Sequence, residues 1–121
     1  MLVPVPVQQQ IAAQAPLVAY VPRQLPAGWR FATWIATGSM LEIDFKRSGG
    51  GTVQFFVTPY RGSCGAGSLG SSGGTYWART VTRLSAWRCV AGKKLSAELF
   101  PAQRLSKTAL LRFVGSARHL D

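Results

Sequence analysis

The chain has 121 residues and carries 14 Lys and Arg residues against four carboxylates and one His, which gives a formal net charge of +10. This length suits one domain with a hydrophobic core, and an apolar content of 47% argues against disorder of the whole chain. Catalysis on polar substrates usually recruits Asp, Glu, His or Cys, so this composition argues against an enzyme and predicts no catalytic residues and no cofactor.

The first 16 residues are rich in proline and glutamine, which is typical of a linker or an extended lead-in. They lack the positive charge and the continuous apolar core of a secretion signal. No stretch of the chain reaches the roughly 20 apolar residues that span a bilayer. We expect a lead-in over residues 1–16, a single β-rich domain over 17–121 and no transmembrane segment. Two locations stay open: the cytoplasm, or an extracytoplasmic site reached through a removed or separate targeting segment.

Short runs of alternating, β-branched or aromatic residues predict strands through most of the domain. The candidates are residues 17–21, 29–37, 41–46, 52–58, 76–80, 84–91 and 94–100. The first of them ends at Pro22 and is expected at a sheet edge. In the second, we expect Trp29, Phe31 and Ile35 to share one face. A glycine-rich loop over residues 59–74 separates the first four candidates from the last three.

The last element is predicted to be a helix. Ser106 is a good N-cap, and the apolar residues after it recur at helical spacing. They are Ala109, Leu110, Phe113, Val114 and Ala117. We expect Gly115 to mark close packing, and Arg118 and His119 to lie at the C-terminal end of this helix, where positive charge is favourable. The predicted class is α+β, mostly β: an antiparallel sheet of five to seven strands covered on one face by a C-terminal helix.

The two cysteines, Cys64 and Cys89, are predicted to form a disulfide rather than to remain unrelated thiols. Neither belongs to a Cys-x-x-Cys pair or has His, Asp or Cys neighbours at metal-ligand spacing. A bond between them would stabilise the fold by about 3.5 kcal/mol in the chain-entropy model, and it favours an oxidising compartment. No metal site is expected elsewhere, because Glu42 and Asp44 share their strand face with Lys46 and are interpreted as a solvated surface.

Two glycine-rich motifs resemble functional fingerprints but lack the required context. Residues 65–70 match G-x-G-x-x-G, yet a strand follows them, and no acidic residue lies where ribose recognition needs one. Residues 70–74 match G-x-S-x-G, with Glu98 and His119 following in the order of a Ser–acid–His triad. A nucleophile elbow requires a helix directly after the serine. We interpret both motifs as parts of a flexible loop, and His119 as a solvent-facing residue.

Three aromatic residues, Trp34, Phe56 and Phe100, are expected on the strand faces opposite to the main apolar sets. Aromatic side chains on an otherwise polar sheet face can stack on bases or sugars, or dock a peptide. They can equally lie under the lead-in or the long loop. Together with Arg30 and Arg88, these three residues form our candidate binding surface.

Residues 20–29 read Y-V-P-R-Q-L-P-A-G-W. This segment resembles the Y-x-P-x-x-L-P-x-G-aromatic opening of small β-rich extracytoplasmic domains of bacterial envelope proteins, some of them linked to anti-sigma regulators or lipoproteins. Residues 105–114, with Leu110, Phe113 and Val114, look like the C-terminal helix of those domains. The resemblance implies a domain outside the cytoplasmic membrane that binds or senses, and it supplies no catalytic residues.

We therefore expect a non-enzymatic binding or sensing domain of the bacterial envelope, or a secreted one, whose ligand the sequence does not identify. The positive charge favours an anionic envelope component or a protein as its partner. The alternative is a basic nucleic-acid-binding module that uses the sheet-face aromatics and Arg residues, although its cations are scattered along the chain.

Overall fold

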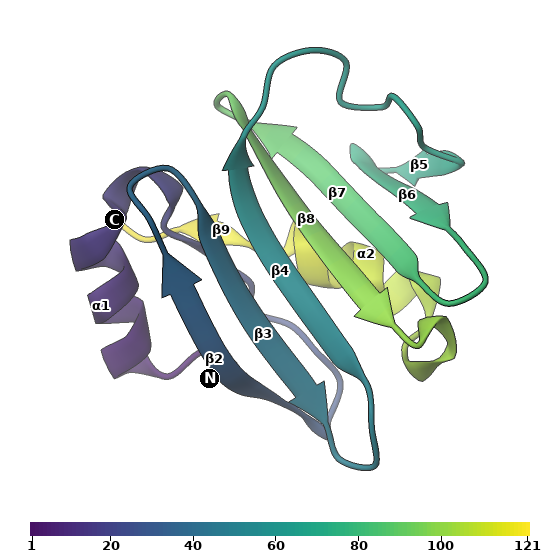
Figure 1. Ribbon diagram of the computed structural model, residues 1–121, viewed down its shortest axis with the longest axis horizontal. Helices are drawn as coiled ribbons and strands as arrows, with labels where there is room; N and C mark the ends of the chain where they lie inside the picture. Colours follow the sequence, from purple (N-terminus) through teal and green to yellow (C-terminus); the bar gives the residue numbers. More distant parts are fainter.

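A computed structural model describes residues 1–121 as a seven-stranded antiparallel sheet with helices packed against one face (Figure 1). In spatial order the strands are β2 (Trp29–Ala36), β3 (Leu41–Arg47), β4 (Thr52–Pro59), β8 (Lys93–Phe100), β7 (Leu84–Val90), β6 (Thr75–Arg79) and β5 (Gly70–Ser72). The C-terminal helix α2 (Lys107–Gly115) packs on β6, β7 and β8. The predicted α+β class, with an antiparallel sheet and a covering C-terminal helix, is confirmed.

Strict alternation along the central strands builds the face that meets the helices, called here the inner face. One set of side chains in β3, β4 and β8 is fully buried there, and the other set faces outward. The buried set consists of Leu41, Ile43, Phe45, Val53, Phe55, Val57, Leu95, Ala97 and Leu99. Phe113 of α2 meets this layer, with its ring centroid 5.4 Å from that of Phe45 and 5.8 Å from that of Phe55.

The alternation breaks once, in β2. The pairing of β2 with β3 shifts between Phe31 and Thr33, so the residues beyond the shift exchange faces. Trp34 lies opposite Ile43 on the inner face, whereas Ile35 is 64% exposed on the outer face. The prediction that Trp29, Phe31 and Ile35 share one face is therefore wrong at Ile35, because the period of two was counted through a bulge.

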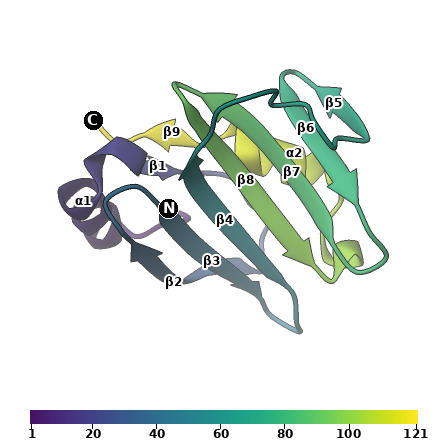
Figure 2. The ribbon, with the colours of Figure 1, turned by 45° about the horizontal axis from the view of Figure 1, so that its top comes forward.

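The N-terminal segment packs on the core instead of running as an extended lead-in. It forms α1 (Val5–Gln14) and the short 3-10 helix η1 (Pro16–Val18). Val3, Ile11 and Ala15 are fully buried in the same core cluster as the sheet. The early prolines do not oppose this helix, because the first turn needs no backbone N–H donors. Residues 1–16 are therefore continuous with the packed domain, and α1 lies beside the β2 edge in both views (Figures 1 and 2).

The two ends of the chain meet in a separate ladder. Strand β1 (Tyr20–Val21) pairs with β9 (Arg118–His119), so only the last two residues of the predicted 17–21 strand are extended. The helix begins as expected, with the Ser106 side chain accepting from the Ala109 N–H at 3.1 Å. It ends at Gly115, however, so His119 belongs to a strand and not to the helix end.

Gly115 does not mark close packing. A Cβ atom placed at this glycine would meet no other atom within 4 Å. The remaining connection, the 3-10 helix η2 (Ala102–Arg104), joins β8 to α2 and buries Ala102.

Candidate functional site

The disulfide attaches the glycine-rich loop to the outer face of the sheet. Cys64 of this loop is bonded to Cys89 near the end of β7, as predicted. Trp87, two residues earlier on the same face, donates from Nε1 to the Cys64 carbonyl at 2.6 Å. Its ring stacks with Tyr76, and the Lys94 ammonium lies 5.0 Å from its centroid. This corner of the outer face is therefore covered, and Trp87 is buried.

Close approach to aromatic rings explains two glycines of the G-x-G-x-x-G motif. A Cβ at Gly65 would lie 2.8 Å from a ring carbon of Tyr76, and a Cβ at Gly70 would lie 2.7 Å from Nε1 of Trp77. The motif then continues into the β5–β6 hairpin, without the helix N-terminus that holds a pyrophosphate in dinucleotide-binding proteins.

The five residues of the candidate binding surface do not lie together. Arg30, Phe56 and Phe100 face outward, as their pairing with outer-face residues of neighbouring strands requires. Trp34 and Arg88 lie on the inner face, opposite the buried Ile43 and Leu95. The sheet therefore separates these two residues from the other three.

Arg88 caps the end of helix α2. Its guanidinium donates from Nε to the Val114 carbonyl at 3.3 Å and from an Nη atom to the Ala117 carbonyl at 2.7 Å. Burial lowers the pKa of Arg88 from its ordinary value, the charge of Arg118 lowers it further, and Tyr20 opposes the shift. Cations at a helix C-terminus complement its partial negative charge, so these contacts stabilise the helix layer.

An open cleft of about 500 Å³ lies beside this cap, and Arg88, Arg118, His119 and Tyr20 contribute to its lining. The Arg and His side chains of the cleft already have partners in the protein. The Arg118 guanidinium donates to the Gly115 carbonyl at 2.7 Å. The cleft thus presents cations whose hydrogen-bonding capacity is largely used by the end of α2.

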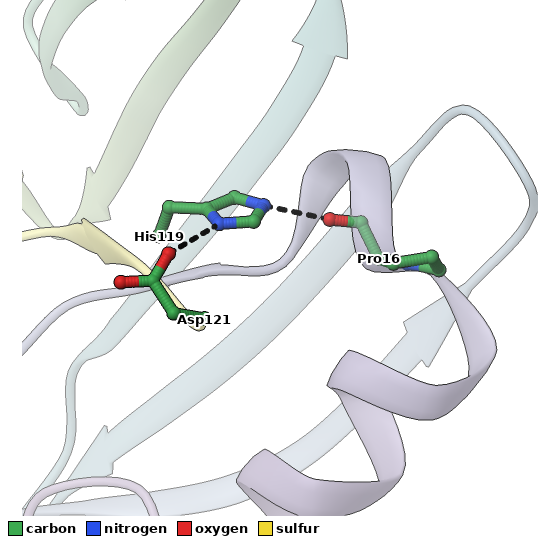
Figure 3. A network of polar contacts seen from close by, with 3 residues as sticks. All are labelled: Pro16, His119 and Asp121. Atoms are coloured by element: carbon green, nitrogen blue, oxygen red, sulfur yellow. Dashed lines mark hydrogen bonds and ion pairs between the residues drawn. The ribbon is translucent and has the colours of Figure 1, made fainter.

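His119 is held between two segments of the chain (Figure 3). Its Nε2 donates to the Pro16 carbonyl at 2.7 Å, and its Nδ1 lies 3.6 Å from a carboxylate oxygen of Asp121. Glu98 lies on the outer face of β8, where its carboxylate accepts from the Ser85 hydroxyl. The sheet stands between Glu98 and His119, so the Ser–acid–His order is not assembled into one site.

Three of the four carboxylates, Glu42, Asp44 and Glu98, face outward from the centre of the sheet. Gln54 lies between them and donates to Glu42 at 3.5 Å. Burial raises the pKa of Glu42, and the hydrogen bond and charge of Asp44 add to this rise. No cluster of three or more His, Cys, Asp or Glu side chains could hold a metal ion. The outer face therefore combines the aromatic residues Phe56 and Phe100 with these three carboxylates and with the cations Arg30, Lys46 and Lys94.

The opposite side of the molecule is basic. The inner face, α2 and the segments after it contribute Arg79, Arg88, Lys107, Arg112 and Arg118. The only carboxylate in these segments is Asp121. The net charge is thus distributed unevenly between the two sides of the sheet. The scattered positions of the cations along the sequence did not predict this distribution.

A surface depression beside the start of α2 was not predicted from the sequence. Its lining includes Leu69, Trp77 and Val81 together with Arg79 and Lys107. The available signal was the presence of Leu69 and Val81 among small or polar residues in loop segments, where an apolar side chain has no core to join.

Comparison with known proteins leaves the family open. No protein-family model matches the chain, and no curated protein matches its sequence significantly. None of its helices combines the length and apolar character needed to cross a membrane.

Proposed function

We propose that this chain is a non-enzymatic binding or sensing domain of the bacterial envelope or of the secreted fraction. The observation that carries the proposal is the Cys64–Cys89 disulfide. Disulfides persist in oxidising compartments and are rare in the reducing cytosol. The resemblance of residues 20–29 to the opening of extracytoplasmic domains supports the same location.

The charge distribution supports an anionic partner. A positively charged side attracts anionic surfaces over distances of about 10 Å at ordinary salt concentrations. The helix side, with Arg79, Lys107 and Arg112, offers such a region, whereas the outer face carries Glu42, Asp44 and Glu98. The nucleic-acid alternative requires base stacking on Phe56 and Phe100 of the outer face. There the three carboxylates offset the positive charges of Arg30, Lys46 and Lys94, so this face offers a polyanion no net positive charge among its strand residues.

The test is the intact mass of the endogenous protein, recovered from separated cell fractions without reductant. We expect the protein in an envelope or secreted fraction, with a mass lower by two hydrogen atoms than that of the dithiol form. Recovery of the dithiol form from the cytosolic fraction would overturn the proposed location. Nucleic-acid binding would then become the leading hypothesis, with an oligonucleotide affinity that falls steeply as salt is raised.

A further inference from the structure

An apolar patch with a basic border lies beside the N-terminus of α2, and we call it the Val81 patch. It is an open depression of about 710 Å³ lined by Leu69, Trp77, Arg79, Thr80, Val81 and Lys107. Three separate segments contribute: the loop before β5, the strand β6 with the turn that follows it, and the first residue of α2. The backbone N–H of Leu69 donates to the Trp77 carbonyl at 2.8 Å, which brings the first two segments together.

The apolar side chains at the rim are unusually exposed. Val81 is 97% exposed and Leu69 is 64% exposed, although water contact with such side chains is unfavourable. The turn that holds Val81 does not require it. The Thr80 N–H donates to the Arg83 carbonyl, and the Arg83 N–H donates to the Thr80 hydroxyl, so a polar residue at position 81 would keep both bonds. The fold therefore gives no reason for valine here.

Helix stability does not explain the cation at the start of α2 either. Lys107 is the first residue of α2, where a positive charge opposes the helix dipole, and the first turn contains no acidic residue. Its ammonium lies 4.1 Å from the centroid of the Trp77 ring, which holds it at the border of the patch. Arg79 is exposed at the same border, and the lining contains no carboxylate.

We propose that the Val81 patch docks the domain onto an anionic phospholipid bilayer. Val81 and Leu69 enter the boundary between headgroups and acyl chains, Trp77 lies at headgroup depth, and Arg79 and Lys107 contact phosphate groups. The shape favours a bilayer over a small ligand, because small-molecule sites enclose most of the ligand surface, whereas this depression is open. Apolar side chains surrounded by cations are typical of interfacial membrane binding.

This inference deepens the proposed function, since an anionic bilayer is an envelope component. The experiment uses the purified, disulfide-bonded chain and sedimentation with two kinds of vesicles: phosphatidylcholine alone, and phosphatidylcholine mixed with phosphatidylglycerol. We expect binding to the mixed vesicles that weakens as salt is raised, and little binding to phosphatidylcholine alone. Absence of binding to the mixed vesicles at low salt would overturn the proposal.

Variants locate the contact. The double variant L69Q/V81Q should weaken partitioning by about ten-fold, because two side chains lose their apolar environment. Ile35→Gln is the matched control, since Ile35 is also 64% exposed but lies on the outer face. An equal loss in the control and in the double variant would overturn the assignment to this patch.

The variant Lys107→Glu distinguishes a loss of vesicle binding from a loss of folding stability. Reversal of this charge should weaken partitioning by at least about ten-fold while leaving the thermal midpoint unchanged or higher, because the helix dipole favours an acid at this position. A soluble partner is tested with a single-stranded oligonucleotide. If the oligonucleotide competes with vesicles and its affinity is unaffected by Lys107→Glu, the anion site lies outside the patch and the proposal fails. None of these outcomes depends on where the endogenous protein is found, so a cytosolic location and a failure to bind lipid remain distinguishable.

Discussion

At the scale of single residues, the surroundings of each glycine show whether a side chain would fit there. The number of glycines in the sequence does not. Gly65 and Gly70 lie so close to the rings of Tyr76 and Trp77 that any side chain would collide with them. Gly115 has free space around it. Glycine therefore allows close packing against aromatic rings at two positions of the glycine-rich loop, whereas Gly115 at the end of α2 has no such role.

The first prediction compares two glycine-to-alanine variants by chemical denaturation. Gly115→Ala should raise the free energy of unfolding by up to about 1 kcal/mol, because alanine is the better helix former and nothing obstructs its methyl group. Gly70→Ala should lower it by about 1–3 kcal/mol, since its methyl group would lie 2.7 Å from Nε1 of Trp77. Equal effects of the same sign would show that these contacts do not govern stability.

The second prediction concerns Glu42, whose pKa is raised above its ordinary value. The folded protein holds this proton more tightly than the unfolded chain, so stability decreases as pH rises through the folded-state pKa of Glu42. The loss is absent below the ordinary glutamate pKa, at about pH 4. Glu42→Gln should therefore stabilise the protein at pH 7 and have little effect near pH 4, as measured by urea denaturation. If the difference in stability between variant and wild type is the same at pH 7 and near pH 4, the raised pKa of Glu42 is contradicted.

At the scale of elements, regular alternation of residue types predicted the strands and their faces well. The predicted faces were wrong where a strand contains an irregularity. Strands β3, β4 and β8 keep a strict period of two, so their inner and outer faces follow directly from the sequence. In β2 one extra residue moves Trp34 to the inner face, and a bulge leaves no mark in the pattern of residue types. Helix α1 was missed because a Pro/Gln-rich composition is typical of linkers, whereas the packing of Ile11 against distant strands decides its structure.

The candidate site was less predictable than the fold for a related reason. The disulfide followed from the cysteines themselves, since no other partner or ligand was available to them. Arg88 was expected on a binding surface, but the helix that it caps is formed by residues that lie about 26 positions away in the sequence. A cation facing a helix end cannot be distinguished from a cation facing solvent until the two elements are placed together.

A third prediction follows from that cap. Arg88→Gln removes the donors to the Val114 and Ala117 carbonyls and should lower the free energy of unfolding by about 1–3 kcal/mol. Arg112→Gln is the control, because Arg112 lies exposed on the same helix. Urea denaturation of both variants measures the difference, and a similarly small effect of the two changes would show that the cap contributes little.

At the scale of the whole molecule, one sheet separates two surfaces that differ in their balance of charges. On the outer face the carboxylates Glu42, Asp44 and Glu98 are balanced by the cations Arg30, Lys46 and Lys94. The helix side carries Arg79, Arg88, Lys107, Arg112 and Arg118, with Asp121 as the only carboxylate in its segments. The two sides of the sheet therefore differ in charge, a difference that the net charge of the whole chain does not show. An anionic partner meets the helix side first, which is where the Val81 patch lies.

The disulfide gives the fourth prediction. The variant C64S/C89S should lose about 3.5 kcal/mol of stability, because the unfolded chain gains the freedom that the bond removed. Reduction of the wild-type protein should produce the same loss, since both cysteines of the chain are in this bond. Thermal and urea denaturation with and without reductant measure both effects. An unchanged midpoint under reducing conditions would mean that the covered corner at Trp87 is held without the bond.

The β1–β9 ladder has a consequence for synthesis. Tyr20 pairs with His119, and the Leu120 N–H donates to the Ala19 carbonyl at 2.8 Å, so residues 19–21 find these ladder partners only in residues 118–120. While a ribosome still holds those residues, Ala19 and Val21 have no completed layer to enter. The nascent chain therefore keeps an apolar, unpaired segment exposed until these last residues leave the exit tunnel, and chaperone or translocation factors have that interval in which to bind it.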